Sequence, residues 1–301
     1  MAKHPASKNT PKDTSAGDLL LQGSILAVAG ILVRFIGLLY KVPMIRILGQ
    51  EGIGYYNTAY EIYNIGLILS SYSLPLAMSK LIAARRVRNQ HQDVRRVFYS
   101  GLTVSAAAGG LMTLLLLLGG DFITAAIFKS PSSALPLKVM APTIFVFSIM
   151  GVIRGYFQGQ GNMIPTSVSQ IIEQIVHAAV SIGASYGFMI WFATRPNVKS
   201  YGAAGGTLGT LCGAIAALMY LAFLMLLYRK ANPKMVRRKQ QLPKETWAQV
   251  YVTLLFTLTP IILSQFVYQL SGSVDNSMFG QIMDKKGLVE SQRAALLGIY
   301  G

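Results

Sequence analysis

The chain has 301 residues, of which 52% are hydrophobic and only 13% are charged, and its formal net charge is +16. Soluble domains carry about 25% charged residues. The apolar residues fall in long blocks, so the composition excludes a soluble globular protein and predicts an all-α, polytopic membrane helical bundle. The basic residues cluster between these blocks, which favours anionic phospholipids over nucleic acid as partners. With one cysteine, Cys212, and three scattered histidines, we expect no disulfide, metal or other cofactor.

Seven apolar spans and the opening of an eighth follow one another along the chain. A polar, basic segment at residues 1–18 comes first, and we expect a disordered tail there. The first span, residues 19–45, is expected to end at Pro43 and the glycine-rich turn at 49–54. The other spans are predicted at residues 55–78, 98–118, 139–157, 166–191, 203–228 and 251–273, with a short helix at 122–128. Polar residues up to Arg293 follow the seventh span, and residues 294–301 open the eighth.

The spans predict a domain order as well as a topology. A six-helix transmembrane lobe at residues 19–228 is expected after the tail, then a basic loop at 229–250, then the first part of a truncated second lobe at 251–301. Two segments, Lys80–Arg96 and Arg229–Lys244, are strongly basic, whereas the loops between the other spans carry few cations. If each span crosses once, these segments and the tail share one side of the membrane. The positive-inside rule then predicts a cytoplasmic N-terminus.

Arg34 lies in the middle of the first span, and Lys41 follows seven residues later on nearly the same helix face. A guanidinium at this depth costs from about 2.5 to above 10 kcal/mol, and it does not escape by losing its proton. We therefore expect Arg34 to face a wet cavity or a fixed anion rather than lipid. The alternative is an ion pair with a carboxylate on another helix that fixes packing.

Polar stripes on other spans supply further candidates. The fifth span carries one such stripe, with spacings of three and four residues, and the second span carries Asn57, Glu61 and Asn64. Lipid does not satisfy such groups, so we expect the stripes to converge on a shared interior. Glu173 is expected to be a partner of Arg34 or a proton acceptor. The alternative for the uncharged side chains is a hydrogen bond to a neighbouring helix, worth about 1 kcal/mol. The candidate substrate-binding residues are Arg34, Lys41, Glu61, Gln170, Glu173, Gln174 and His177.

The sequence lacks the motifs of the common enzyme classes. It has no GxSxG, HExxH, P-loop or paired-carboxylate pattern, so we expect no enzymatic activity. The glycine-rich segment Ala203–Gly209 has no following Lys-Ser or Lys-Thr and predicts close helix packing instead.

Three segments carry a family resemblance: RFIG at Arg34–Gly37, RILGQEGIGYYNTAY at Arg46–Tyr60, and RGYFQGQGNMIPTSVSQIIEQIV at Arg154–Val176. They resemble oligosaccharide flippases of the multidrug/oligosaccharidyl-lipid/polysaccharide (MOP) exporter superfamily. Within that superfamily they resemble the MurJ-like lipid II flippases and the stage V sporulation protein B branch of low-GC Gram-positive bacteria.

This resemblance implies two six-helix lobes around a central cavity, in a bacterial cytoplasmic membrane. The implied substrates are undecaprenyl-diphosphate-linked sugars such as lipid II, moved between leaflets. Arg34 matches a first-span arginine that is thought to engage the diphosphate, whereas a second arginine of that motif corresponds to Tyr40 here, beside Lys41. The second lobe of a full-length chain is then an expected partner, and the 301-residue chain is expected to be a fragment or a truncated gene product.

Three alternative functions stay open at this point. A drug or cation antiporter of the related multidrug-extrusion branch would favour an acidic cavity, which Arg34 and Lys41 argue against. A membrane-embedded glycosyltransferase would carry a large extracytoplasmic loop, and the loops expected on that side are short. The third is a non-transporting scaffold for cell-wall or spore assembly.

Overall fold

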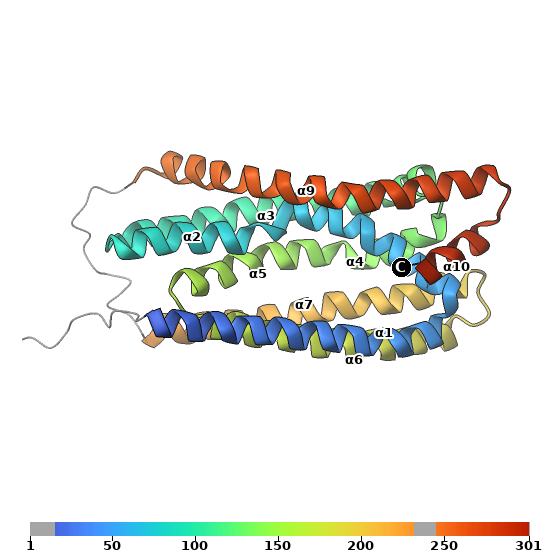
Figure 1. Cartoon of the computed structure of the whole chain (residues 1–301), viewed down its shortest axis with the longest axis horizontal. Coiled ribbons are helices and arrows are strands. Elements are labelled where there is room, and N and C mark those ends of the chain that lie inside the picture. Colours follow the sequence, from blue (N-terminus) through green and yellow to red (C-terminus); the bar gives the residue numbers. More distant parts are fainter. Residues whose placement is uncertain (1–15, 232–244, 301) are drawn as a thin grey trace, which may run out of the picture.

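The computed structural model describes residues 16–231 and 245–300, and these residues form helices and turns without any strand. The helices lie roughly along one long axis (Figure 1). The prediction of an all-α bundle is confirmed. Most of the expected tail at 1–18, and residues 232–244 of the basic loop, lie outside the described residues.

Helix α1, Ala16–Leu67, consists of two arms that meet at Gly49. Gly49 has a φ of 67°, a left-handed value that glycine adopts without steric cost, and the chain reverses there (Figure 1). We refer to residues 16–48 as the first arm and to residues 50–67 as the second arm. The first span therefore ends within the expected glycine-rich segment 49–54, at Gly49, where a single glycine makes the bend. Pro43 does not end it, because the helix continues through that residue.

The second pass extends well beyond its predicted end. After the second arm come a π-helical turn, η1 (Ile68–Tyr72), and helix α2 (Leu74–Val87). Only three residues separate it from helix α3 (His91–Phe122). The basic segment Lys80–Arg96 is thus not an extended loop but two helix ends joined by a short turn. Buried residues of α2 and α3, including Leu81, Ile82 and Val94, explain this, because their packing continues the core to the end of the bundle.

The remaining helices follow the predicted order with shifted bounds. The segment after α3 holds η2 (Ile123–Ile127), where a short helix was expected, then η3 (Pro131–Ser133) and α4 (Ala134–Met140). The later helices are α5 (Pro142–Gly159), α6 (Ile164–Trp191), α7 (Val198–Ala231), α9 (Trp247–Lys285) and α10 (Glu290–Tyr300). The fifth predicted span agrees with α6 to within two residues.

Helix α9 runs about three turns past the predicted end of the seventh span. Its polar last turns are held by the end of η2 and the residue after it: the Ser277 hydroxyl donates to the Ile127 carbonyl at 3.1 Å. A Cβ on Gly280 would lie 2.6 Å from the Phe128 carbonyl oxygen, so the two backbones meet closely there. These contacts keep helical a segment whose sequence alone is too polar to predict as a membrane span.

Buried hydrophobic side chains gather in three clusters. The largest joins α2, α3, α5, α7 and the first turns of α9, and includes Met78, Phe157 and Leu221. A second lies among the second arm of α1, α3 and α4, and a third surrounds the bend at Gly49. The first arm, in contrast, exposes most of its large side chains, with Leu38 69% exposed. A bilayer would cover such an apolar face with lipid.

Five stretches of the described residues are long and apolar enough to cross a membrane: Leu20–Val87, His91–Ile127, Pro131–Gly159, Val198–Tyr228 and Trp247–Lys285. The first of them bends back at Gly49, so it supplies two passes. Helix α6 has 28 residues, which is also enough to cross, although it carries the polar stripe. The chain is therefore a multi-pass membrane protein.

Glycines repeated every four residues set close contacts of α7 with α6 and of α5 with α2. On α7, a Cβ on Gly205, Gly209 or Gly213 would lie within 2.5–2.7 Å of backbone atoms of α6. On α5, Gly155 and Gly159 meet backbone carbonyls of α2 in the same way. Small residues let helix backbones approach in this manner. The prediction that Ala203–Gly209 serves close helix packing is thus confirmed.

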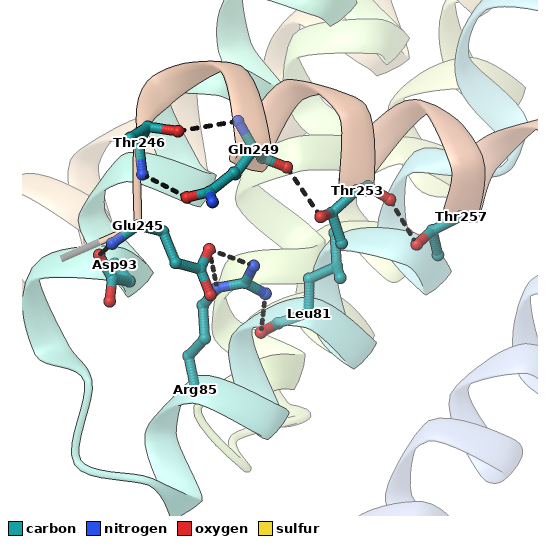
Figure 2. A network of polar contacts seen from close by, with 8 residues as sticks. All are labelled: Leu81, Arg85, Asp93, Glu245, Thr246, Gln249, Thr253 and Thr257. Atoms are coloured by element: carbon teal, nitrogen blue, oxygen red, sulfur yellow. Dashed lines mark hydrogen bonds and ion pairs between the residues drawn. The ribbon is translucent and has the colours of Figure 1, made fainter. Parts of the chain in front are cut away.

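One end of the bundle, which we call the basic end, joins the α2–α3 turn to the start of α9 (Figure 2). The Arg85 guanidinium donates to Glu245 Oε2 from Nη2 at 2.6 Å, and the backbone N–H of Glu245 donates to Asp93 at 3.2 Å. Thr246 and Gln249 then form a capping box that opens α9. The Arg86 side chain also donates to the Gln160 carbonyl. The turns at this end therefore interlock through two arginines.

The opposite end is closed by α10, which lies against the bend in α1 (Figure 1). Backbone carbonyls occupy the space where a Cβ on Gly54 or Gly298 would stand, so the two helices touch backbone to backbone. Glu290 accepts from the Ser132 N–H at 2.8 Å, and Arg293 donates to the Lys129 carbonyl at 3.0 Å. Residues expected only to open an eighth span thus form a helix that packs against α1.

Candidate functional site

The first arm of α1 and helix α6 run parallel, and four contacts fix their register. At the basic end, Gln22 Oε1 accepts from the Met163 N–H at 2.9 Å. Farther along, the Gln174 side chain lies against Gly37, and the Tyr40 and His177 rings lie 4.9 Å apart. Ser185 then contacts the Met44 sulfur at 3.5 Å. In each pair the residue number on α6 is higher than the residue number on α1 by 137 to 141. By this offset, Arg34 lies at the same height in the bundle as residues 171–175 of α6.

Arg34 and Lys41 are both exposed on the first arm. In the part of the chain that the structure describes, Arg34 forms no ion pair with a carboxylate. Arg34 lies 15 residues from the start of the predicted span, or about 22 Å along a helix axis, which places it deep in the bilayer. A permanent cation at this depth requires an anion or water.

Glu173 is paired with Arg154 of α5, not with Arg34. Arg154 Nη2 donates to Glu173 Oε2 at 2.8 Å, and Arg154 Nε donates to the Ser169 hydroxyl at 3.0 Å. Their side chains are only 10% and 20% exposed. The expectation that Glu173 is a partner of Arg34 is therefore corrected by this geometry.

The rest of the α6 stripe divides between two neighbours. Gln174 fits against Gly37, whose lack of a side chain leaves room for the amide. His177 is buried, and its Nε2 lies 3.3 Å from the Thr210 hydroxyl of α7. These contacts match the packing alternative for His177. Gln170 is half-buried on the same stripe.

Glu61 lies in a different environment, on the second arm of α1 facing α9. The side chain of Asn276 is its hydrogen-bonding neighbour, and Asp275 is close enough to act on it electrostatically. Its Oε2 is buried and has no hydrogen-bond partner among residues 16–231 and 245–300. This carboxylate therefore lies beside α9, whereas Glu173 is paired with Arg154 of α5.

Sequence reasoning assigned no role to Arg154 or Ser169, although Arg154 opens one of the segments that carry the family resemblance. The available signal was a lone arginine in the apolar run of the fourth span, together with Ser169 and Glu173 four residues apart on one helix face. Across the described ranges, no three His, Cys, Asp or Glu side chains gather in a way that would hold a metal ion.

Comparison with known sequences finds a family model, described as polysaccharide biosynthesis protein, that matches residues 19–300. Stage V sporulation protein B of Bacillus subtilis (strain 168) is 29% identical over 257 residues, which cover 85% of this chain and 48% of that protein. Lipid II flippase MurJ of the same organism is 22% identical over 292 residues, covering 93% and 53%. The chain thus spans about half the length of these curated relatives.

Solved structures show the same fold. A MOP superfamily transporter from Pyrococcus furiosus superposes with a TM-score of 0.65 at 15% identity, covering 97% of this chain and 65% of that one. An inward-facing multidrug resistance MATE family transporter of the MOP superfamily has a TM-score of 0.59 at 16% identity, covering 89% and 59%. The chain therefore has the fold of a MOP superfamily transporter and belongs to the polysaccharide biosynthesis protein family.

Proposed function

We propose that the protein is a flippase for a lipid-linked sugar precursor, such as lipid II, carried on undecaprenyl diphosphate. The observation that carries this proposal is the charge at Arg34. Its guanidinium is exposed deep in the bilayer without a carboxylate partner in the described chain, while Glu173, at the same level, is neutralised by Arg154. The site therefore offers an unmatched cation to an anionic ligand.

The chemistry of the substrate agrees with these residues. A diphosphate needs fixed cations, and an arginine fork binds phosphate oxygens in a bidentate manner. The sugars need polar side chains such as Gln170 and Gln174, while a polyprenyl tail can stay in lipid. One relative is named as a lipid II flippase, which supports this substrate class. A drug or cation antiporter is less well supported, because it would favour an acidic site.

Depletion of the protein in a bacterial cell that carries it tests the proposal. Lipid II at the outer face of the cytoplasmic membrane should fall several-fold, while lipid II inside accumulates. Outer-face lipid II is measured by its accessibility to an impermeant enzyme that cleaves it. An unchanged outer pool, in cells without a second flippase, would contradict lipid II as the substrate.

We further propose that the basic end faces the cytoplasm of a bacterial cell, so that the N-terminus is cytoplasmic. Lys80, Arg88 and Arg95 are exposed at this end, where they meet anionic phospholipid headgroups. In a Cys212→Ser background, Val87→Cys should resist an impermeant thiol reagent in intact cells, whereas Thr194→Cys at the opposite end should react. Both positions are exposed, so reactivity reports sidedness. The opposite labelling pattern would reverse the proposed orientation.

A further inference from the structure

Arg154 is a buried arginine near the end of α5 whose guanidinium reaches across to α6. Its Nε donates to Ser169 Oγ and its Nη2 donates to Glu173 Oε2, at 3.0 and 2.8 Å. The Ser169 hydroxyl donates its own proton to the Thr166 carbonyl at 2.7 Å, which leaves its lone pairs for Arg154. Two fixed acceptors, four residues apart on one face of α6, therefore set the orientation of the guanidinium.

This pair joins α5 to α6, two helices that otherwise meet mainly through their common neighbour α7. Helix α5 packs chiefly against α2 and α3, whereas α6 packs chiefly against α7 and the first arm of α1. The backbone of Glu173 packs directly against Gly213 of α7. The two lie so close that a Cβ added to Gly213 would be 2.6 Å from the Glu173 carbonyl oxygen. The carboxylate therefore has a fixed base on α6 and a fixed partner on α5.

A buried ion pair of this kind contributes little net stability, because desolvation of both charges offsets their attraction. The pair matters more for the charge of the site than for the stability of the fold. Glu173 lies level with Arg34 along the bilayer normal, according to the register between α1 and α6. Without Arg154, Glu173 would add a negative charge at that depth, which would repel a diphosphate or attract Arg34 away from it.

We propose that Arg154 is a positioning residue that determines specificity for an anionic headgroup: it holds and neutralises Glu173, so that Arg34 is left to bind the diphosphate. The inference rests on the proposed function and adds a residue that adjusts the same site. In this role Arg154 acts through Glu173, because its Nε and Nη2 both donate to side chains of α6.

Binding of undecaprenyl diphosphate to the purified chain in nanodiscs tests this role. Arg154→Gln should weaken the Kd at least fivefold, because it leaves Glu173 uncompensated. Glu173→Gln should tighten it at least threefold, because it leaves an additional cation, and the double variant should return to within about twofold of the unaltered chain. Both changes should shrink when the salt concentration rises from 50 to 500 mM, since the effect is electrostatic.

The opposite signs of the two single variants separate this role from a structural one, because loss of a purely structural pair would weaken binding in both. Arg85→Gln is the matched control. Arg85 is also a buried arginine paired with a carboxylate, at 2.6 Å, but at the basic end, so its loss should leave the Kd unchanged. If Arg154→Gln does not fold, the direction of the Glu173→Gln change still decides.

Three results would overturn the inference: weaker binding by Glu173→Gln, unchanged binding by Arg154→Gln, or an equal loss in Arg85→Gln. The proposed function would remain in each of these cases, because the unaltered chain still binds the lipid. If the unaltered chain does not bind undecaprenyl diphosphate at all, the proposed function fails and the inference fails with it.

Discussion

Replacement of Arg34 by alanine is expected to abolish export of the lipid-linked sugar without lowering the amount of protein in the membrane. Arg34 has no carboxylate partner in the described part of the chain, so its removal leaves no buried charge unpaired. Removing a cation from the bilayer interior should even favour insertion, by about 2.5 kcal/mol or more. On the proposed function, export should fail because the diphosphate would lose the cation at Arg34.

Arg34→Lys should restore export only poorly, since an ammonium keeps the charge but loses the planar fork that matches two phosphate oxygens. Arg195→Ala is a suitable control, because Arg195 is an exposed cation in the connection between α6 and α7. It should leave both export and abundance unchanged. The measurement is outer-face lipid II beside membrane abundance, in the same cells.

The contrary outcome is also well defined. If Arg34→Ala lowers abundance and Glu173→Gln restores it, then Arg34 and Glu173 form a buried pair, whose disruption costs about 3–5 kcal/mol. That result would contradict both the diphosphate role and the Arg154–Glu173 geometry. Normal abundance with lost export would support the role in binding.

Features set by local sequence were predictable from this chain. The bounds of α6 follow from an apolar run that begins after Pro165 and ends near Trp191. The close contact of α7 follows from glycines four residues apart, because that spacing puts them on one face. Arg34 was identifiable as a candidate, because a charge in an apolar span is unusual whatever the fold.

Features set by tertiary contacts were not predictable. The pairing of Glu173 with Arg154 depends on how α5 packs beside α6, and the sequence offered Arg34 as an equally reasonable partner. The long end of α9 depends on a neighbour distant in sequence, since Ser277 donates to the Ile127 carbonyl. Glu61 shares the helical spacing of the other stripes, yet it faces α9 rather than the first arm of α1.

The contact between α6 and α7 should be sensitive to a single methyl group. Gly209→Ala should destabilise the protein, because it overpacks this contact. Overpacking costs about 1–3 kcal/mol, and we expect a value near 3 kcal/mol. A Cβ at this position would lie 2.6 Å from the Ser181 amide nitrogen and 2.7 Å from the His177 carbonyl oxygen. These are backbone atoms, which cannot rotate away, so the two helices must separate. The bond from the Ser181 hydroxyl to the Gly206 carbonyl, 2.8 Å long, would be strained as well.

Gly183→Ala is the matched control for this change, because Gly183 is also helical and no atom lies within 4 Å of its added Cβ. Alanine favours a helix over glycine by about 1 kcal/mol, so the control should be neutral or stabilising. Thermal unfolding of the two purified variants in the same detergent measures the difference. Equal unfolding temperatures would show that α6 and α7 do not meet backbone to backbone at Gly209. A large loss confined to Gly209→Ala would instead support the packing that holds His177 and, through Gly213, the base of Glu173 in place.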